Sequence, residues 1–106
     1  KMSTTALLPD QDSEMQNALG FELRELSPQE KKQFDISGAY VHSIRKKTTI
    51  GKTNMEAGFI ISKVNNIKVG TVSQTINEIS KVKGKVKLEG FYIDFPGKYS
   101  YEFYME

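Results

Sequence analysis

Hydrophobic and polar residues alternate with a period of two at several places along this chain. In residues 19–26 the apolar side chains of Phe21 and Leu23 are separated by polar ones, and the segment ends at Leu26. Short alternating runs are typical of a half-buried strand. A strand is therefore predicted over 19–26.

Five further strands are predicted, among them a mostly buried one at 58–64. They lie at residues 38–44, 58–64, 67–69, 86–93 and 98–105. Asn65-Asn66 joins the second and third of these, and a two-residue asparagine turn is typical of a hairpin. Residues 94–97 are predicted to link the last two strands. The final strand alternates cleanly, with Tyr99, Tyr101, Phe103 and Met105 on one side and Ser100, Glu102 and Tyr104 on the other.

Two helices interrupt the strands, and each has a recognisable start. Ser27 precedes Pro28, and Glu30 follows three residues after the serine, which is the pattern of a capping box. This pattern predicts a short helix over 28–34. A single helical turn is also expected within 48–55.

The second helix is predicted over residues 72–80. Thr71 is its expected N-cap, with Gln74 as the partner three residues later. Apolar residues recur in this helix at spacings of four and three, namely Val72, Ile76 and Ile79. That spacing places them on one stripe, which we expect to face other parts of the domain.

Antiparallel strands with two helices between them indicate an α+β fold, a small partly open antiparallel barrel or sandwich. A chain of 106 residues with 38% hydrophobic content suits one domain with a modest core. Residues 1–17 lack apolar periodicity and are predicted to be a disordered linker or tag remnant. The domain is expected to occupy 18–106.

Composition excludes several classes of function. The net charge is +2 with mixed signs, so a nucleic-acid surface is not expected, and basic clusters such as 45–47 are read as solvated. No apolar run is long enough to span a bilayer. The chain has no cysteine, which excludes disulfides and thiolate metal sites.

Catalytic chemistry is not indicated by the sequence. His42 is the single histidine, and it lies in a predicted strand with no nucleophile motif beside it. We therefore interpret His42 as a surface residue rather than a catalytic base. No catalytic residue, metal site or cofactor is predicted.

Leu19-Gly20-Phe21 is the most informative step in the chain. Glycine at the start of a strand allows a sharp turn that aims successive N–H groups into one concavity. Such a concavity suits a carboxylate, and the open edge of the following strand can pair with an incoming peptide.

The predicted peptide groove lies between strand 21–26 and helix 72–80. Its binding residues are predicted to be Leu19, Gly20, Phe21, Glu22, Leu23, Val72, Ile76 and Ile79. The first three supply N–H groups for the carboxylate, and the apolar side chains line the pockets. In the alternative interpretation these apolar side chains are simply core.

Residues 19–30, 56–69 and 84–90 together resemble a PDZ domain of the HtrA/Deg class of bacterial envelope serine proteases, most closely the second such domain. The resemblance covers residues 19–106 and implies a PDZ-like fold without catalytic activity of its own. Many relatives carry a basic residue just upstream of the Leu-Gly step, whereas this chain has Gln16-Asn17-Ala18. Backbone N–H groups alone would then neutralise a bound carboxylate.

The resemblance also implies partners and location. Expected ligands are C-terminal or extended hydrophobic peptides of unfolded proteins, captured in the periplasm or cell envelope by a protease parent. The alternative is a structural role, in which the domain contacts other protomers or domains of the parent and binds no free peptide.

Overall fold

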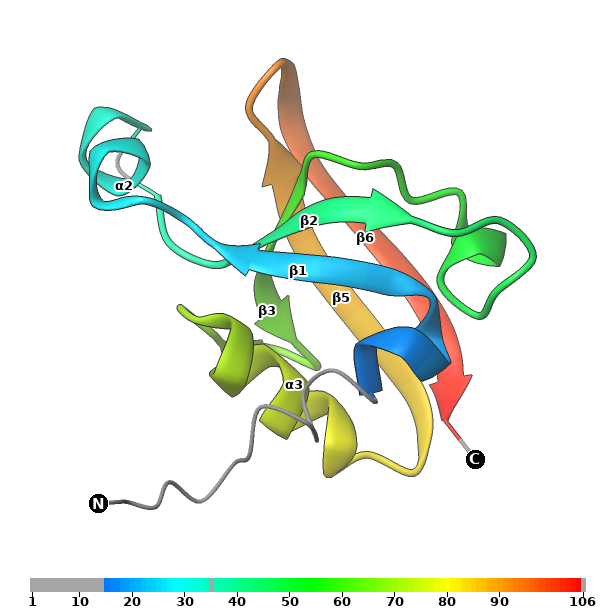
Figure 1. Cartoon of the computed structure of the whole chain (residues 1–106). Coiled ribbons are helices and arrows are strands. Elements are labelled where there is room, and N and C mark those ends of the chain that lie inside the picture. The colour runs from blue at the N-terminus through cyan, green and yellow to red at the C-terminus, as the bar shows by residue number, and fades with distance from the viewer. Residues whose placement is uncertain (1–14, 35, 106) are drawn as a thin grey trace, which may run out of the picture.

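The computed structural model describes residues 15–34 and 36–105 (Figure 1). A helical turn at residues 15–19, here called the N-terminal turn, precedes the first strand. The elements that follow are β1 (Phe21–Glu25), α2 (Pro28–Phe34), β2 (Ala39–Ile44), η1 (Gly51–Thr53), β3 (Phe59–Val64), β4 (Ile67–Lys68), α3 (Val72–Ser80), β5 (Gly84–Tyr92) and β6 (Phe95–Met105).

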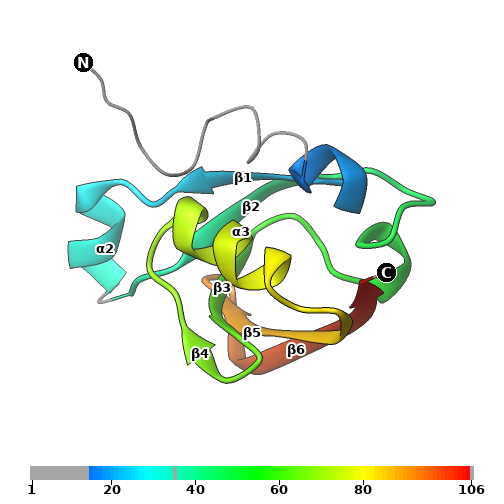
Figure 2. The same ribbon diagram turned by 90° about the horizontal axis from the view of Figure 1, so that it is seen from below.

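All the strands belong to one antiparallel sheet of six strands. Their order is β1-β2-β3-β5-β6, and β4 pairs with β3 beside this path. The sheet curves into a partly open barrel, and α3 lies in the opening next to β1 (Figure 2). The α+β prediction is confirmed, with β1 and β6 at the two ends of the sheet.

The core lies between the inner face of the curved sheet and α3. Its fully buried side chains come from both layers and include Phe21, Val41, Phe59, Ile61, Val64, Val86, Leu88 and Ile79. The alternation seen in the sequence explains this arrangement, because every second residue of β5 is buried from Val86 to Tyr92.

Local signals in the sequence are confirmed at both helices and at the first hairpin. The Ser27 hydroxyl accepts a hydrogen bond from the Glu30 N–H at 3.0 Å, and the Glu30 carboxylate accepts one from the Ser27 N–H at 2.9 Å. Asn65 and Asn66 have φ of 48° and 72°, the mirror-image turn that matches the twist of a hairpin.

Thr71 caps α3 as predicted, but Gln74 makes a different second bond. The Thr71 hydroxyl accepts from the Gln74 N–H at 3.0 Å. The Gln74 side chain accepts from the N–H of Gly70 at 2.7 Å, one residue before the cap. Both bonds satisfy backbone donors at the start of the helix.

The second hairpin is longer and its turn is tighter than predicted. The predicted linker 94–97 is mostly strand, because Tyr92 pairs directly with Phe95 and leaves a two-residue turn. Pro96 is accommodated because β6 is at the end of the sheet, where its missing N–H breaks no ladder. Residues 15–17 of the predicted tail are helical, and residues 1–14 lie outside the described part of the chain.

Candidate functional site

The Leu19-Gly20 step forms a turn that only glycine can make here. Gly20 has φ of 100°, and a Cβ at this position would collide with the side chain of Thr48. The carbonyl of Leu19 accepts from the Ile50 N–H and that of Gly20 from the Arg45 N–H, both at 2.8 Å. The turn is therefore fixed to the loop that follows β2.

Gln16 occupies two backbone donors of the predicted site. Its carbonyl accepts from the Gly20 N–H at 2.8 Å, and its side-chain oxygen accepts from the Leu23 N–H at 2.8 Å. In the described part of the chain β1 has β2 as its one neighbouring strand, so Leu23 offers its N–H on the open edge. A side chain, not a strand, pairs with that edge.

The apolar residues of the predicted groove divide into two groups. Leu19, Phe21, Ile76 and Ile79 are buried members of the core. Val72 is also a buried member of this core, and Leu23 is half-buried against it. Met15 of the N-terminal turn also packs on this cluster. Of the predicted apolar groove residues, Leu23 is therefore the one that remains partly exposed.

Glu22, also predicted in the site, is directed elsewhere. Its carboxylate accepts a hydrogen bond from the Ser43 hydroxyl at 2.9 Å, so the side chain reaches across to β2. This contact ties β1 to its neighbour and leaves Glu22 exposed.

Glu25 bridges β1 and α3, the two elements of the predicted groove, and was missed by sequence reasoning. Both of its carboxylate oxygens lie near the N–H of Val72, at 3.2 and 3.1 Å. A carboxylate at the first turn of a helix is favourable because the helix N-terminus carries partial positive charge. The strand β1 is thus linked to α3 at one end by Glu25, while Gln16 covers its edge at the other.

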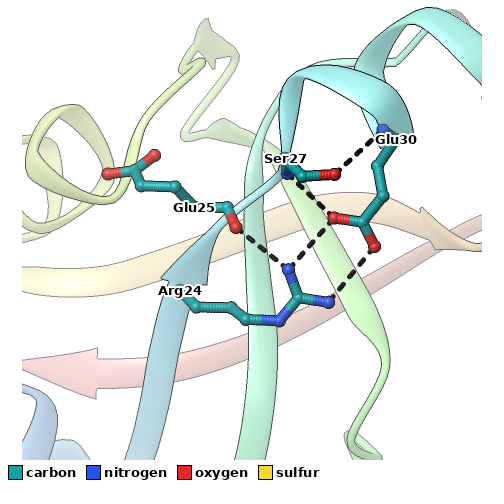
Figure 3. Close-up of polar contacts among 4 residues, drawn as sticks. All are labelled: Arg24, Glu25, Ser27 and Glu30. Atoms are coloured by element: carbon teal, nitrogen blue, oxygen red, sulfur yellow. Dashed lines mark hydrogen bonds and ion pairs between the residues drawn. The ribbon is translucent and has the colours of Figure 1, made fainter.

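A charged cluster fixes the path from β1 into α2 (Figure 3). The Arg24 guanidinium donates to the Glu30 carboxylate at 3.1 and 3.2 Å and lies 3.9 Å from the centre of the Tyr40 ring. The hydrogen bond from Arg24, followed by that from the Ser27 N–H, lowers the pKa of Glu30 to about 2. The same bond with Glu30 raises the pKa of Arg24.

The remaining candidate chemistry is sparse. His42 is exposed on β2, where it borders an open hollow of about 430 Å³ with Gln16 and Leu23. Within 15–34 and 36–105, no three His, Cys, Asp or Glu side chains gather closely enough to hold a metal ion. No helix in these ranges is long and apolar enough to cross a membrane.

Comparison with known proteins gives a structural match rather than a sequence match. No protein-family model and no curated protein matches the sequence. Among solved structures, the chain is similar to the HtrA3 PDZ domain bound to a phage-derived ligand, FGRWV. The TM-score is 0.69 at 18% identity, over 81% of each chain. The predicted fold is confirmed, and this chain therefore has the fold of a PDZ domain.

Proposed function

We propose that this domain binds the C-terminal ends of extended peptides, which add a strand to β1 in the groove beside α3. One observation carries the proposal. The Leu23 N–H on the open edge of β1 is paired with the Gln16 side chain, at a position where a peptide carbonyl would make the same bond.

The chemistry of the groove favours a hydrophobic peptide end. Val72 and Ile76 offer no side-chain hydrogen bond to a ligand hydroxyl, and a buried hydroxyl without a partner costs about 1–3 kcal/mol. An apolar side chain instead gains roughly 25 cal/mol per Å² on burial. The ligand of the similar HtrA3 domain, FGRWV, ends in valine.

The terminal carboxylate is proposed to bind the N–H groups of Leu19, Gly20 and Phe21. No basic side chain stands just before this turn in the sequence, and the affinity is expected to be micromolar at best. The ligand must also displace Gln16 from the N–H groups of Gly20 and Leu23.

Chemical-shift mapping with FGRWV and with its C-terminal amide tests the proposal. The free acid is expected to shift the backbone signals of residues 16–25 and 72–79, and the amide to bind more weakly. If neither peptide shifts these signals, the alternative is favoured, in which the domain has a structural role and contacts other protomers or domains of its parent.

We further infer that the parent is a serine protease of the HtrA/Deg class in the periplasm or cell envelope. The support is the sequence resemblance over 19–106 together with the structural similarity to the HtrA3 domain. Sequencing the gene upstream tests this inference, since a trypsin-like nucleophile loop preceded by a histidine and an aspartate is expected there. An unrelated upstream domain would contradict it.

The domain itself is proposed to be non-catalytic. His42, its single histidine, is exposed on β2. Purified chain should therefore hydrolyse casein no faster than a blank. Hydrolysis that survives repurification and disappears in His42→Ala would contradict this.

A further inference from the structure

The hairpin of β5 and β6 carries a group of aromatic rings away from the peptide groove. Tyr92 lies at its centre, with the ring of Phe95 5.9 Å away and that of Tyr99 5.0 Å away, centroid to centroid. The interplanar angles are 81° and 84°, so both rings stand nearly perpendicular to Tyr92. Phe95 and Tyr99 are exposed, and the group opens to solvent.

Hydrogen bonds and packing hold the inner rings in place. The hydroxyls of Tyr92 and Tyr101 lie 2.7 Å apart, and the Glu56 N–H donates to the Tyr92 oxygen at 3.1 Å. The Tyr101 ring packs edge-on against buried Phe59 at 5.0 Å. Because these rings are fixed before any ligand arrives, binding beside them requires little ordering.

Together these residues line a small open cavity with one carboxylate. The cavity, here called the aromatic pocket, has a volume of about 180 Å³ and is lined by Glu56, Tyr92, Phe95, Tyr99 and Tyr101. Among the described residues Glu56 has no ion pair. Burial raises the pKa of the Tyr101 hydroxyl, and the nearby Glu56 charge acts in the same direction.

We propose that the aromatic pocket binds an organic cation, such as an alkylammonium or guanidinium group. Aromatic faces carry partial negative charge and attract cations within about 6 Å of the ring centre, and the Glu56 carboxylate adds a full negative charge. An anionic ligand would be repelled by the same carboxylate. The site is separate from the peptide groove, which lies on β1 and α3.

A cation held by both an aromatic ring and a carboxylate already occurs once within this domain. The Arg24 guanidinium lies 3.9 Å from the centre of the Tyr40 ring and pairs with the Glu30 carboxylate at 3.1 Å. There the cation comes from the chain itself. In the aromatic pocket the rings and the carboxylate are present, and an external cation would complete the same combination.

Titration with choline and with its neutral isostere, 3,3-dimethylbutan-1-ol, tests the proposal by NMR. Choline is expected to shift the signals of Glu56, Phe95 and Tyr99, whereas the neutral alcohol leaves them in place. Nα-acetylarginine amide distinguishes a guanidinium ligand from a quaternary ammonium. Equal shifts from choline and the alcohol would overturn the proposal, as would no shift from either cation at tens of millimolar.

Variants test whether cation binding depends on the aromatic rings themselves or only on a hydrophobic surface. Tyr99→Leu is expected to weaken cation binding about fivefold, whereas Tyr99→Phe retains it because the ring remains. Glu56→Gln should also weaken it. Tyr104→Leu is the matched control, since Tyr104 is exposed and alternates to the other side of β6. Unchanged affinity in Tyr99→Leu and Glu56→Gln, with an unchanged melting temperature, would contradict the assignment.

Discussion

Single residues determine the shape of the proposed peptide groove before any ligand is considered. The positive φ of Gly20 turns the chain into β1, and Thr48 fills the space that a side chain would need. Gln16 then covers the edge that the turn creates. The glycine was identifiable from the sequence because its role is local. The pairing of Gln16 with Leu23 depends on how the preceding turn folds back, so residue patterns did not reveal it.

Gly20→Ala is expected to destabilise the domain by about 2 kcal/mol or more, through backbone strain and the collision with Thr48. Gly97→Ala is the matched control, since its φ is 95° but nothing lies within 4 Å of an added Cβ. It should cost less, from strain alone. Urea unfolding of the two variants measures the difference in the free energy of unfolding. Equal losses of stability would show that the collision with Thr48 contributes nothing.

Gln16→Ala is expected to strengthen peptide binding about threefold to tenfold, because one competing hydrogen bond to Leu23 is removed. Gln16→Glu keeps an acceptor at the same place and adds a negative charge near the ligand carboxylate, so it should weaken binding. Calorimetry with FGRWV measures both. If the two variants change the affinity in the same direction, Gln16 does not compete with the ligand.

At the scale of elements, prediction succeeded where the signal lies within a few residues. Ser27 with Glu30 and Asn65 with Asn66 are local patterns, and they fixed the start of α2 and the β3–β4 hairpin. The turn of the second hairpin was predicted too long, because Pro96 and Gly97 were read as loop. The Tyr92–Phe95 pair, formed across the strands, closes that turn instead.

The pH dependence of stability should report the link between β1 and α2. The pKa of Glu30 is lowered from 4.5 to about 2 in the folded chain, so the unfolded chain binds more protons between these values. The stabilisation from this carboxylate is present above about pH 4.5 and is lost as the pH falls toward 2. Comparing wild type with Glu30→Gln by chemical unfolding across this range measures it.

Removing the partner provides the control for that experiment. The Arg24 hydrogen bond is the largest cause of the lowered pKa. In an Arg24→Met background, the stability difference between Glu30 and Glu30→Gln should therefore depend less on pH. An undiminished pH dependence would place its origin outside this pair.

Across the whole molecule, the two proposed sites lie at opposite ends of the sheet. The peptide groove uses β1, and the aromatic pocket uses the β5–β6 hairpin. The overall fold was predictable because alternation and helix spacing run through the whole core. The aromatic pocket was not, because Glu56 and Tyr92 approach each other only through folding.

Binding at one site is expected to leave the other unchanged. The residues of the two sites do not overlap, so the coupling free energy should be near zero. The affinity for FGRWV, measured with and without saturating choline, should agree within about a factor of two. A larger change would mean that the two ends of the sheet are energetically linked.

The β6 edge of the sheet has features that disfavour strand pairing between copies of the chain. A long outer strand such as β6, of 11 residues, would normally serve as a template on which copies of the chain could stack. Pro96 has no N–H to contribute, and Gly97, with φ of 95°, bends the backbone out of the extended form. Charged Lys98 and Glu102 follow along the same strand. The β1 edge can therefore accept another strand, whereas the β6 edge disfavours strand pairing.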